Sequence, residues 1–450
     1  TLMLAALLPL TPLLMAEEEE DPFAALDRLL EDNFNSIDLT LDEQFEILNE
    51  AMEDGYQRLS EEVAENWGNN EVRLPTQTTW VDYSDDLNIR RMIDFELGTV
   101  SIERIINVDD KVASIVGDIA TANDALQTDN LADLAGKDTA LKYAKKNLES
   151  RGLEIIQPDM TERSDEPVLA GLSQPVSPTL LADAVSQALK LDSLTDKKLA
   201  QSKTDSVSPP FAATVTPLKN HKRKVSIQVP LKANFKDLLA DEYLATVANE
   251  AEKQNLPPSL LLAVMETESH FNPRARSAVP AYGLMQLVPR SGAMDAYEKV
   301  YGEKTLLGPE YLYQPDNNME LGAAYLHILH NRYLRHIDDP DSLQYCAIAA
   351  YNTGAGNVAK SFTGATNVRT AAKIINTMTP NEVYAHLQQN LPYEETRRYI
   401  VKVTEAQKKY FAFDEVAQGN SSNDTEVARN TMAPNLLRYV GVHQTSEPHL

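Results

Sequence analysis

The chain has 450 residues, of which 43% are hydrophobic, and this is enough apolar material for at least one full core and, by length, for two or three domains. Its formal net charge is -26 at pH 7. Such an acidic chain is a poor partner for nucleic acid or for an anionic membrane surface, because both bind proteins through Lys and Arg. We therefore expect a folded, soluble protein with an acidic, solvated surface and no nucleic-acid partner.

Cysteine usage and the first residues limit the chemistry and the location of the protein. Cys346 is the only cysteine, so the sequence allows no intrachain disulfide and no thiolate cluster for zinc. We expect no metal and no cofactor. Residues 1–16, TLMLAALLPLTPLLMA, form an uncharged apolar run with two prolines. We interpret this run as the remains of a secretory signal, with a mature chain that begins near Glu17, and a buried helix is the alternative.

The segment 17–69 contains a predicted amphipathic helix. Thr40 and Glu43 have the spacing of a capping box, which marks a helix start. Apolar residues then follow at helical spacing along one face. They are Leu41, Phe45, Leu48, Met52, Tyr56, Leu59 and Val63.

A small α+β domain is predicted over residues 70–231. β-Branched and aromatic residues flank a turn at Gly98, with Ile93 and Phe95 before it and Val100 and Ile102 after it, which indicates a hairpin with an apolar face. Residues from about 107 to 200 have a helical pattern with polar interruptions. The stretch 194–224 is polar and contains prolines, which indicates a loop, and 224–231 is a returning strand closed by Pro230.

Almost every segment after residue 233 has a helical period, and the loops between them are marked by Asn-Pro, Gly and Pro. We therefore predict an all-α domain over residues 232–415. The remaining residues, 416–450, are polar and are expected to form a loosely held tail.

Two acids stand in the predicted helix 258–269. Glu268 shares its apolar face with Leu261 and Val264, whereas Glu266 points elsewhere and is expected to be solvated. A carboxyl on an apolar face loses hydration when it ionises, so its pKa rises, as a general acid near neutral pH requires. Glu268 is therefore the candidate acid catalyst, and a buried Glu held by a backbone or Arg partner is the alternative.

Small and polar residues in three later motifs are candidates for a site around this acid. YGLMQ contains a glycine that permits close approach and an amide that can donate and accept, and AAYNTGAGNV and ETRRYIVKV place aromatic and polar residues at helix ends. Taken singly, each is also explained by packing or capping. The candidates are Gly283, Gln286, Tyr351, Asn352, Glu395 and Tyr399.

In order and spacing, ETESHFNPRARSAVPAYGLMQLVP, AAYNTGAGNV and ETRRYIVKV resemble the motifs of the goose-lysozyme-like domain of lytic murein transglycosylases. The resemblance covers residues from about 235 to 412, and IINTMTPNEVYAHL and YLRHIDDPDSLQYCAIAAYN are most similar to a membrane-bound branch of that family. A weaker likeness in WGNNEV and YSDDLNIRRMIDFELGTVSIE extends it to the amino-terminal domain of the same branch.

The resemblance implies an α+β protein in which an all-α lysozyme-like catalytic domain follows a small mixed α+β amino-terminal domain. Glu268 matches the acid/base of the family, Ser277 the serine that holds the N-acetyl group of the sugar, and Tyr351 the tyrosine that faces the acid. The further substrate-binding residues that it implies are Gly283, Leu284, Met285, Gln286, Asn352, Glu395 and Tyr399.

The activity implied is cleavage of the β-1,4 bond between N-acetylmuramic acid and N-acetylglucosamine in peptidoglycan, with a 1,6-anhydro end formed instead of the addition of water. A goose-type lysozyme that hydrolyses this bond and a non-catalytic peptidoglycan-binding scaffold are the alternatives. The expected partners are peptidoglycan glycan strands in the periplasm of a Gram-negative bacterium, with association at the outer membrane and with other cell-wall enzymes. The family carries a lipid anchor, which this sequence does not support, because no cysteine stands near residue 16.

Overall fold

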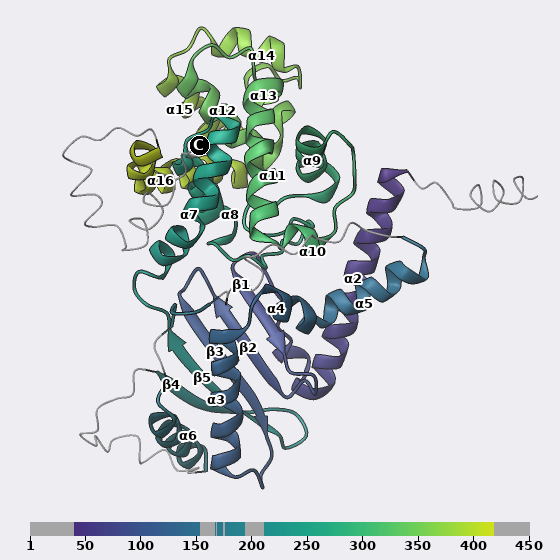
Figure 1. Ribbon diagram of the computed structural model, residues 1–450, viewed down its shortest axis with the longest axis vertical. Helices are drawn as coiled ribbons and strands as arrows, with labels where there is room; N and C mark the ends of the chain where they lie inside the picture. Colours follow the sequence, from purple (N-terminus) through teal and green to yellow (C-terminus); the bar gives the residue numbers. More distant parts are fainter. Residues whose placement is uncertain (1–39, 154–166, 168, 174–175, 194–210, 418–450) are drawn as a thin grey trace, which may run out of the picture.

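The computed structural model describes residues 40–153, 167, 169–173, 176–193 and 211–417. An antiparallel sheet with its own helices makes up the amino-terminal part, and a group of helices makes up the carboxy-terminal part (Figure 1). This architecture confirms the predicted α+β class. The predicted signal remnant, the chain before Thr40 and the polar tail from 418 lie outside the described residues.

The helix α2, Leu41–Trp67, confirms the prediction from spacing. Thr40 and Glu43 make the predicted capping box, because the Thr40 hydroxyl accepts from the Glu43 amide and the Glu43 carboxylate accepts from the Thr40 amide. α2 packs against α5, Thr139–Ser150 (Figure 1), and its apolar face is buried.

The sheet has five antiparallel strands in the order β1-β2-β3-β5-β4. The predicted hairpin is formed by β2, Ile89–Asp94, and β3, Thr99–Ile106, with Ile93 opposite Val100. β1, Thr79–Tyr83, lies on one side of it, and β5, Arg223–Pro230, pairs with β3 on the other. The returning strand that ends at Pro230 is therefore confirmed.

The prediction of a continuous loop over 194–224 was wrong in part. β4, Ala212–Pro217, lies within this stretch and forms the edge of the sheet by pairing with β5. An edge strand has a neighbour on one side only, so it tolerates proline and polar residues that a central strand excludes. Residues 194–210 lie outside the described part of the chain.

One face of the sheet is covered by α3, Val112–Thr128, and α6, Pro178–Ser193. The apolar side chains of alternate strand residues on this face, such as Ile102 and Ile227, are buried against these helices. α4, Leu131–Lys137, links α3 to α5. These helices agree with the helical pattern predicted from about 107 onward.

The opposite face of the sheet carries a buried group of charges. The Arg90 guanidinium, which is fully buried, pairs with Glu103 and lies 4.4 Å from the centroid of the Trp67 ring. The Lys224 ammonium donates to Glu103 at 3.0 Å and to Glu71 at 2.6 Å. Burial alone would raise the pKa of Glu103, but the positive charges of Arg90 and Lys224 outweigh it and hold this pKa below its usual value.

The carboxy-terminal part is all helical, as predicted. Its central elements are α7, Phe235–Gln254, α8, Pro258–Ser269, and α16, Glu394–Ala417, of which α8 and α16 pack most extensively. The surrounding helices are α9 Met294–Tyr301, α10 Pro309–Leu312, α11 Pro315–Ile328, α12 Pro340–Thr353, α13 Ala355–Thr363, α14 Val368–Ile375 and α15 Pro380–Asn390, with π-helical turns at Pro289–Ala293 and Leu329–Tyr333.

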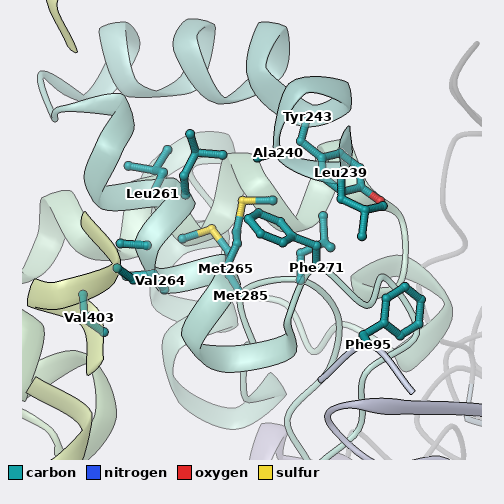
Figure 2. Close-up of a cluster of buried hydrophobic side chains, with 14 of the residues drawn as sticks. Phe95, Leu239, Ala240, Tyr243, Leu261, Val264, Met265, Phe271, Met285 and Val403 are labelled. Atoms are coloured by element: carbon teal, nitrogen blue, oxygen red, sulfur yellow. The ribbon is translucent and has the colours of Figure 1, made fainter. Parts of the chain in front are cut away.

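One of two apolar clusters runs from the sheet into these helices. Phe95, just after β2, belongs to the same buried cluster as Met265 and Phe271, and Figure 2 shows them together. Gly98 has a φ of 68°, and a Cβ at this position would lie 2.7 Å from a ring carbon of Phe235 at the start of α7. The hairpin turn therefore lies directly against the helical part. In the described residues, no helix is both long and apolar enough to cross a membrane.

The buried charges of the sheet generate a first prediction. Glu103→Gln should lower the free energy of unfolding by about 3–5 kcal/mol, because it leaves the buried cations Arg90 and Lys224 short of a counter-charge. Urea unfolding would measure this. The control is Glu394→Gln, which removes an exposed pair with Arg398 and should cost less than about 1 kcal/mol. Equal small losses in both variants would contradict the prediction.

Candidate active site

Glu268 lies in the last turn of α8. The helix begins at Pro258 and ends at Ser269, as predicted, and the side chains of residues 260–265 are fully buried. The Ser269 hydroxyl bonds the carbonyls of Met265 at 3.1 Å and of Leu284 at 2.8 Å, which ties the helix end to the Gly-Leu-Met-Gln turn. The end of α8 is therefore a fixed platform for the acid.

The environment of Glu268 raises its pKa from 4.5 to about 7. Loss of hydration is the main cause, and the Tyr399 hydroxyl opposes it by stabilising the ionised form. The negative charge of Glu395 raises the pKa further. Glu268 is nevertheless partly accessible to solvent. A carboxyl of this kind can lose and regain a proton at neutral pH.

Two tyrosines from different helices face this carboxyl. Tyr351, on α12, donates its hydroxyl to the Met285 carbonyl at 2.7 Å. The Tyr399 hydroxyl, on α16, is buried and, among the described residues, has no hydrogen bond of normal geometry. Burial raises the pKa of each phenol well above the usual value for tyrosine, and the charge of Glu268 raises both pKa values further. Both tyrosines therefore stay protonated, but the Tyr351 proton is already donated to the Met285 carbonyl, so only the Tyr399 hydroxyl remains available as a donor.

The turn that contains Gly283 and Gln286 has a tightly constrained backbone. Gly283 has a φ of 78°, and a Cβ there would lie 2.2 Å from the Leu312 carbonyl oxygen. Gln286 adopts a left-handed φ of 48°, and its side-chain amide donates to the carbonyls of Ala275 and Gly283 at 3.1 and 3.0 Å. Its Oε1 atom is buried and has no partner in the described part of the chain.

The other predicted residues of this turn have packing roles. The side chains of Leu284 and Met285 are both 0% exposed, so they belong to the core and do not form a ligand surface. Only the backbone of Met285 reaches the site, through the hydrogen bond from Tyr351. The close approach of Met285 to α11 requires Gly322, because a Cβ there would lie 2.1 Å from the Met285 sulfur.

Three predicted residues, all within the described ranges, have no hydrogen bond to the acid. Ser277 is half-buried in its own turn, where its hydroxyl accepts from the Ala281 amide at 3.2 Å and donates to the Val279 carbonyl. Asn352 joins α12 to α16 by accepting from the Thr396 hydroxyl at 2.7 Å. Glu395 is exposed in the first turn of α16 and acts on Glu268 through its charge.

Asn318 is a residue of this region that sequence reasoning missed. Its side chain is 0% exposed and makes three hydrogen bonds to the backbone around the turn: it accepts from Met285 N at 2.7 Å and donates to the carbonyls of Tyr282 and Leu312. Asn318 stands directly before the apolar pattern MELGAAYL of α11, and this position was the available signal. A buried amide that satisfies backbone groups in this way fixes a loop.

The expectation that Glu266 is solvated was wrong. Glu266 is 7% exposed, and its carboxylate accepts from the Lys409 ammonium at 2.7 Å and from the Tyr410 hydroxyl at 2.9 Å. The physical reason is that α16 packs across this side of α8 and brings these partners with it. Periodicity within α8 contains no information about that packing.

Comparisons with known proteins are consistent with this geometry. The profile of the family described as "Transglycosylase SLT domain" matches residues 245–374, which include Glu268 and Tyr351. The profile described as "Membrane-bound lytic murein transglycosylase C, N-terminal domain" matches residues 43–143. The fold and the two matched regions define an enzyme of the lytic transglycosylase class.

Curated relatives narrow this class. The chain is 32% identical over 347 residues to membrane-bound lytic murein transglycosylase C of Klebsiella pneumoniae (strain 342), with 76% of this chain and 85% of the relative covered. It is 33% identical over 356 residues to the protein of the same name from Pectobacterium atrosepticum, with the same coverage. The chain therefore belongs to the membrane-bound lytic murein transglycosylase C family.

Among solved structures, the chain is similar to lytic transglycosylase Slt of Pseudomonas aeruginosa. The identity is 27%, the TM-score is 0.29, and the match covers 40% of this chain and 24% of the other.

The raised pKa of Glu268 generates a prediction for stability. Because the folded-state value of about 7 exceeds the ordinary 4.5, the stability linked to this proton is present below pH 4.5 and is lost as the pH rises through 7. The free energy of unfolding of Glu268→Gln minus that of wild type should therefore increase by about 1–3 kcal/mol from pH 5 to pH 8. Urea unfolding at the two pH values would measure the gain. The same difference at both pH values would show that the carboxyl is not desolvated.

Proposed function

We propose that the protein cleaves the β-1,4 bond between N-acetylmuramic acid and N-acetylglucosamine in peptidoglycan and leaves a 1,6-anhydro end on the muramyl sugar. The observation that supports this most directly is the partly accessible carboxyl of Glu268 with its pKa near 7. At neutral pH a large share of such a carboxyl is protonated and the rest is ionised, so the same group can act first as an acid and then as a base.

In the first step Glu268 donates its proton to the glycosidic oxygen as the bond from C1 to that oxygen breaks. In the second step the Glu268 carboxylate accepts the proton of the muramyl 6-hydroxyl as its oxygen bonds to C1. No water is consumed, and the proton that is lost in the first step returns in the second. The Tyr399 hydroxyl would stabilise the ionised form of Glu268 between the two steps, and Tyr351 would hold the Met285 backbone of the site by its hydrogen bond.

A retaining hydrolase of the usual kind would need a second carboxylate close to the first. Glu395 acts on Glu268 through its charge, but it is exposed on the surface of α16. We therefore assign the stabilisation of C1 to the N-acetyl group of the substrate, oriented by Ser277. We propose that the free Oε1 of Gln286 accepts a hydrogen bond from an amide or hydroxyl of the sugar. Asn352, which joins α12 to α16, is proposed to line the same site.

The proposed partners are peptidoglycan glycan strands and other enzymes of the cell wall. The relatives with which the chain aligns over most of its length are named membrane-bound murein enzymes. We propose the same setting here, the periplasm of a Gram-negative bacterium, with association at the outer membrane.

The role of Glu268 is tested by a pair of variants on the same helix. Glu268→Gln should reduce wall lysis by about 10²-fold or more, because an amide neither donates nor accepts the catalytic proton. Glu266→Gln should be less stable, because the Lys409 pair is lost, yet remain active when folded. Release of soluble fragments from purified sacculi measures both. Wild-type activity in Glu268→Gln would remove the proposed acid.

The product separates a transglycosylase from a goose-type lysozyme. The tethered 6-hydroxyl should outcompete water, because intramolecular attack needs no encounter. The released muramyl ends should therefore be lighter than hydrolytic ends by the mass of one water, about 18 Da, because the tethered hydroxyl takes the place of water in the attack. Digestion in water enriched in oxygen-18, followed by mass spectrometry, decides between them: label at the new C1 would establish a hydrolase. Binding to sacculi without any release would indicate a scaffold.

A further inference from the structure

The loop that follows α8 is attached to the amino-terminal part at three points. We call residues 272–282 the Ser277 loop. The Asn272 side-chain amide donates to the Gln77 carbonyl at 3.2 Å, and the Arg276 backbone amide donates to the Thr76 carbonyl at 3.2 Å. The Arg274 guanidinium pairs with Asp138, the N-cap of α5. A loop of the helical part is thus held by groups that belong to the sheet and its helices.

Arg276 makes a further contact with α2. Its guanidinium lies 4.0 Å from the centroid of the Tyr56 ring, and Tyr56 is only 5% exposed. Within the described residues, the Nε atom of Arg276 and the hydroxyl of Tyr56 are both buried without a hydrogen-bond partner. The contact is therefore between the cation and the face of the ring, and such a contact strengthens when water is excluded.

The same loop is joined to the Gly-Leu-Met-Gln turn. The Ala275 carbonyl accepts from the Gly283 amide at 3.0 Å and from the Gln286 side chain at 3.1 Å. Arg276 pairs with Tyr282 in a short antiparallel bridge, and the Ser277 amide donates to the Ala281 carbonyl at 3.2 Å. A displacement of Arg276 would therefore move its neighbour Ser277 directly.

We infer that Tyr56 and Arg276 are positioning residues, through which the amino-terminal part holds Ser277 in the place where the substrate binds. This inference rests on the proposed function, in which Ser277 orients the N-acetyl group. Glu268 is placed by α8 itself, which is fixed by α7 and α16. Loosening the Ser277 loop should therefore weaken substrate binding and slow bond cleavage at C1, while the pH dependence set by Glu268 is kept.

The test uses the full chain with soluble, uncrosslinked peptidoglycan glycan strands as the substrate. Arg276→Gln and Tyr56→Leu should each raise KM by roughly threefold to tenfold, as expected for the loss of a buried cation–aromatic contact. Each should also lower kcat, because Ser277 orients the N-acetyl group at C1, whereas the pH profile set by Glu268 should stay unchanged. Circular dichroism and thermal melting would confirm that each variant is folded.

Three matched controls separate positioning from general damage. Tyr56→Phe keeps the ring, and because the Tyr56 hydroxyl has no partner among the described residues, this variant should match wild type. Arg276→Lys keeps a cation and should recover part of the lost affinity. Arg290→Gln removes another link to α2, the exposed pairs with Asp42 and Glu46, and should leave KM and kcat unchanged.

A double-mutant cycle with Ser277→Ala provides the deciding measurement. If Arg276 acts through Ser277, the second substitution should add little to the KM of Arg276→Gln, so the fold-changes do not multiply. Fold-changes that multiply, an unchanged KM in Arg276→Gln, or equal effects of Tyr56→Phe and Tyr56→Leu would each overturn the inference. Failure of the proposed function has a different signature, which is an active Glu268→Gln variant.

Discussion

The loss of hydration at the end of α8 is the constraint on which the rest of the site depends. The helix is buried along most of its length and carries two carboxyls that are two residues apart. Within the residues that the structure describes, one of them has hydrogen-bonding partners of normal geometry and the other does not. Glu266 receives the Lys409 ammonium and the Tyr410 hydroxyl from α16, whereas Glu268 receives a hydroxyl and the repulsive charge of Glu395. One packed pair of helices therefore supplies the first acid with a cation and a hydroxyl and raises the pKa of the second by burial.

The backbone around this acid is strained in a way that packing compensates. His270, Phe271 and Gln286 all have positive φ values, of 51°, 65° and 48°, although none is glycine. Such conformations cost about 1 kcal/mol or more each and persist where surrounding contacts determine them. Buried groups supply those contacts: Phe271 packs between Tyr243 and Tyr410, and the Asn318 side chain holds the turn before Gln286. Contacts with buried side chains thus hold the strained backbone of the site in place.

Local patterns predicted those features that depend on local physics. The spacing and capping box of α2 lie within one segment, and the position of Glu268 relative to Leu261 follows from helical geometry alone. The burial of Glu266 depends on Lys409, 143 residues later, so no window of sequence contains it. β4 was missed for a related reason, because its strand conformation comes from pairing with β5 and not from its own composition.

Two contributions raise the pKa of Glu268, which are burial and the negative charge of Glu395. Only the second comes from the acidic surface of the chain. Burial raises the pKa of Glu268 by removing water from its carboxyl, and salt changes this effect little. Glu395 lies in solvent, so its contribution is screened by salt. Since burial is the larger cause, we expect the acid to keep most of its raised pKa when salt is added. The chemistry of Glu268 is thus set by the packing of α8, and the surplus of surface carboxylates only adjusts it.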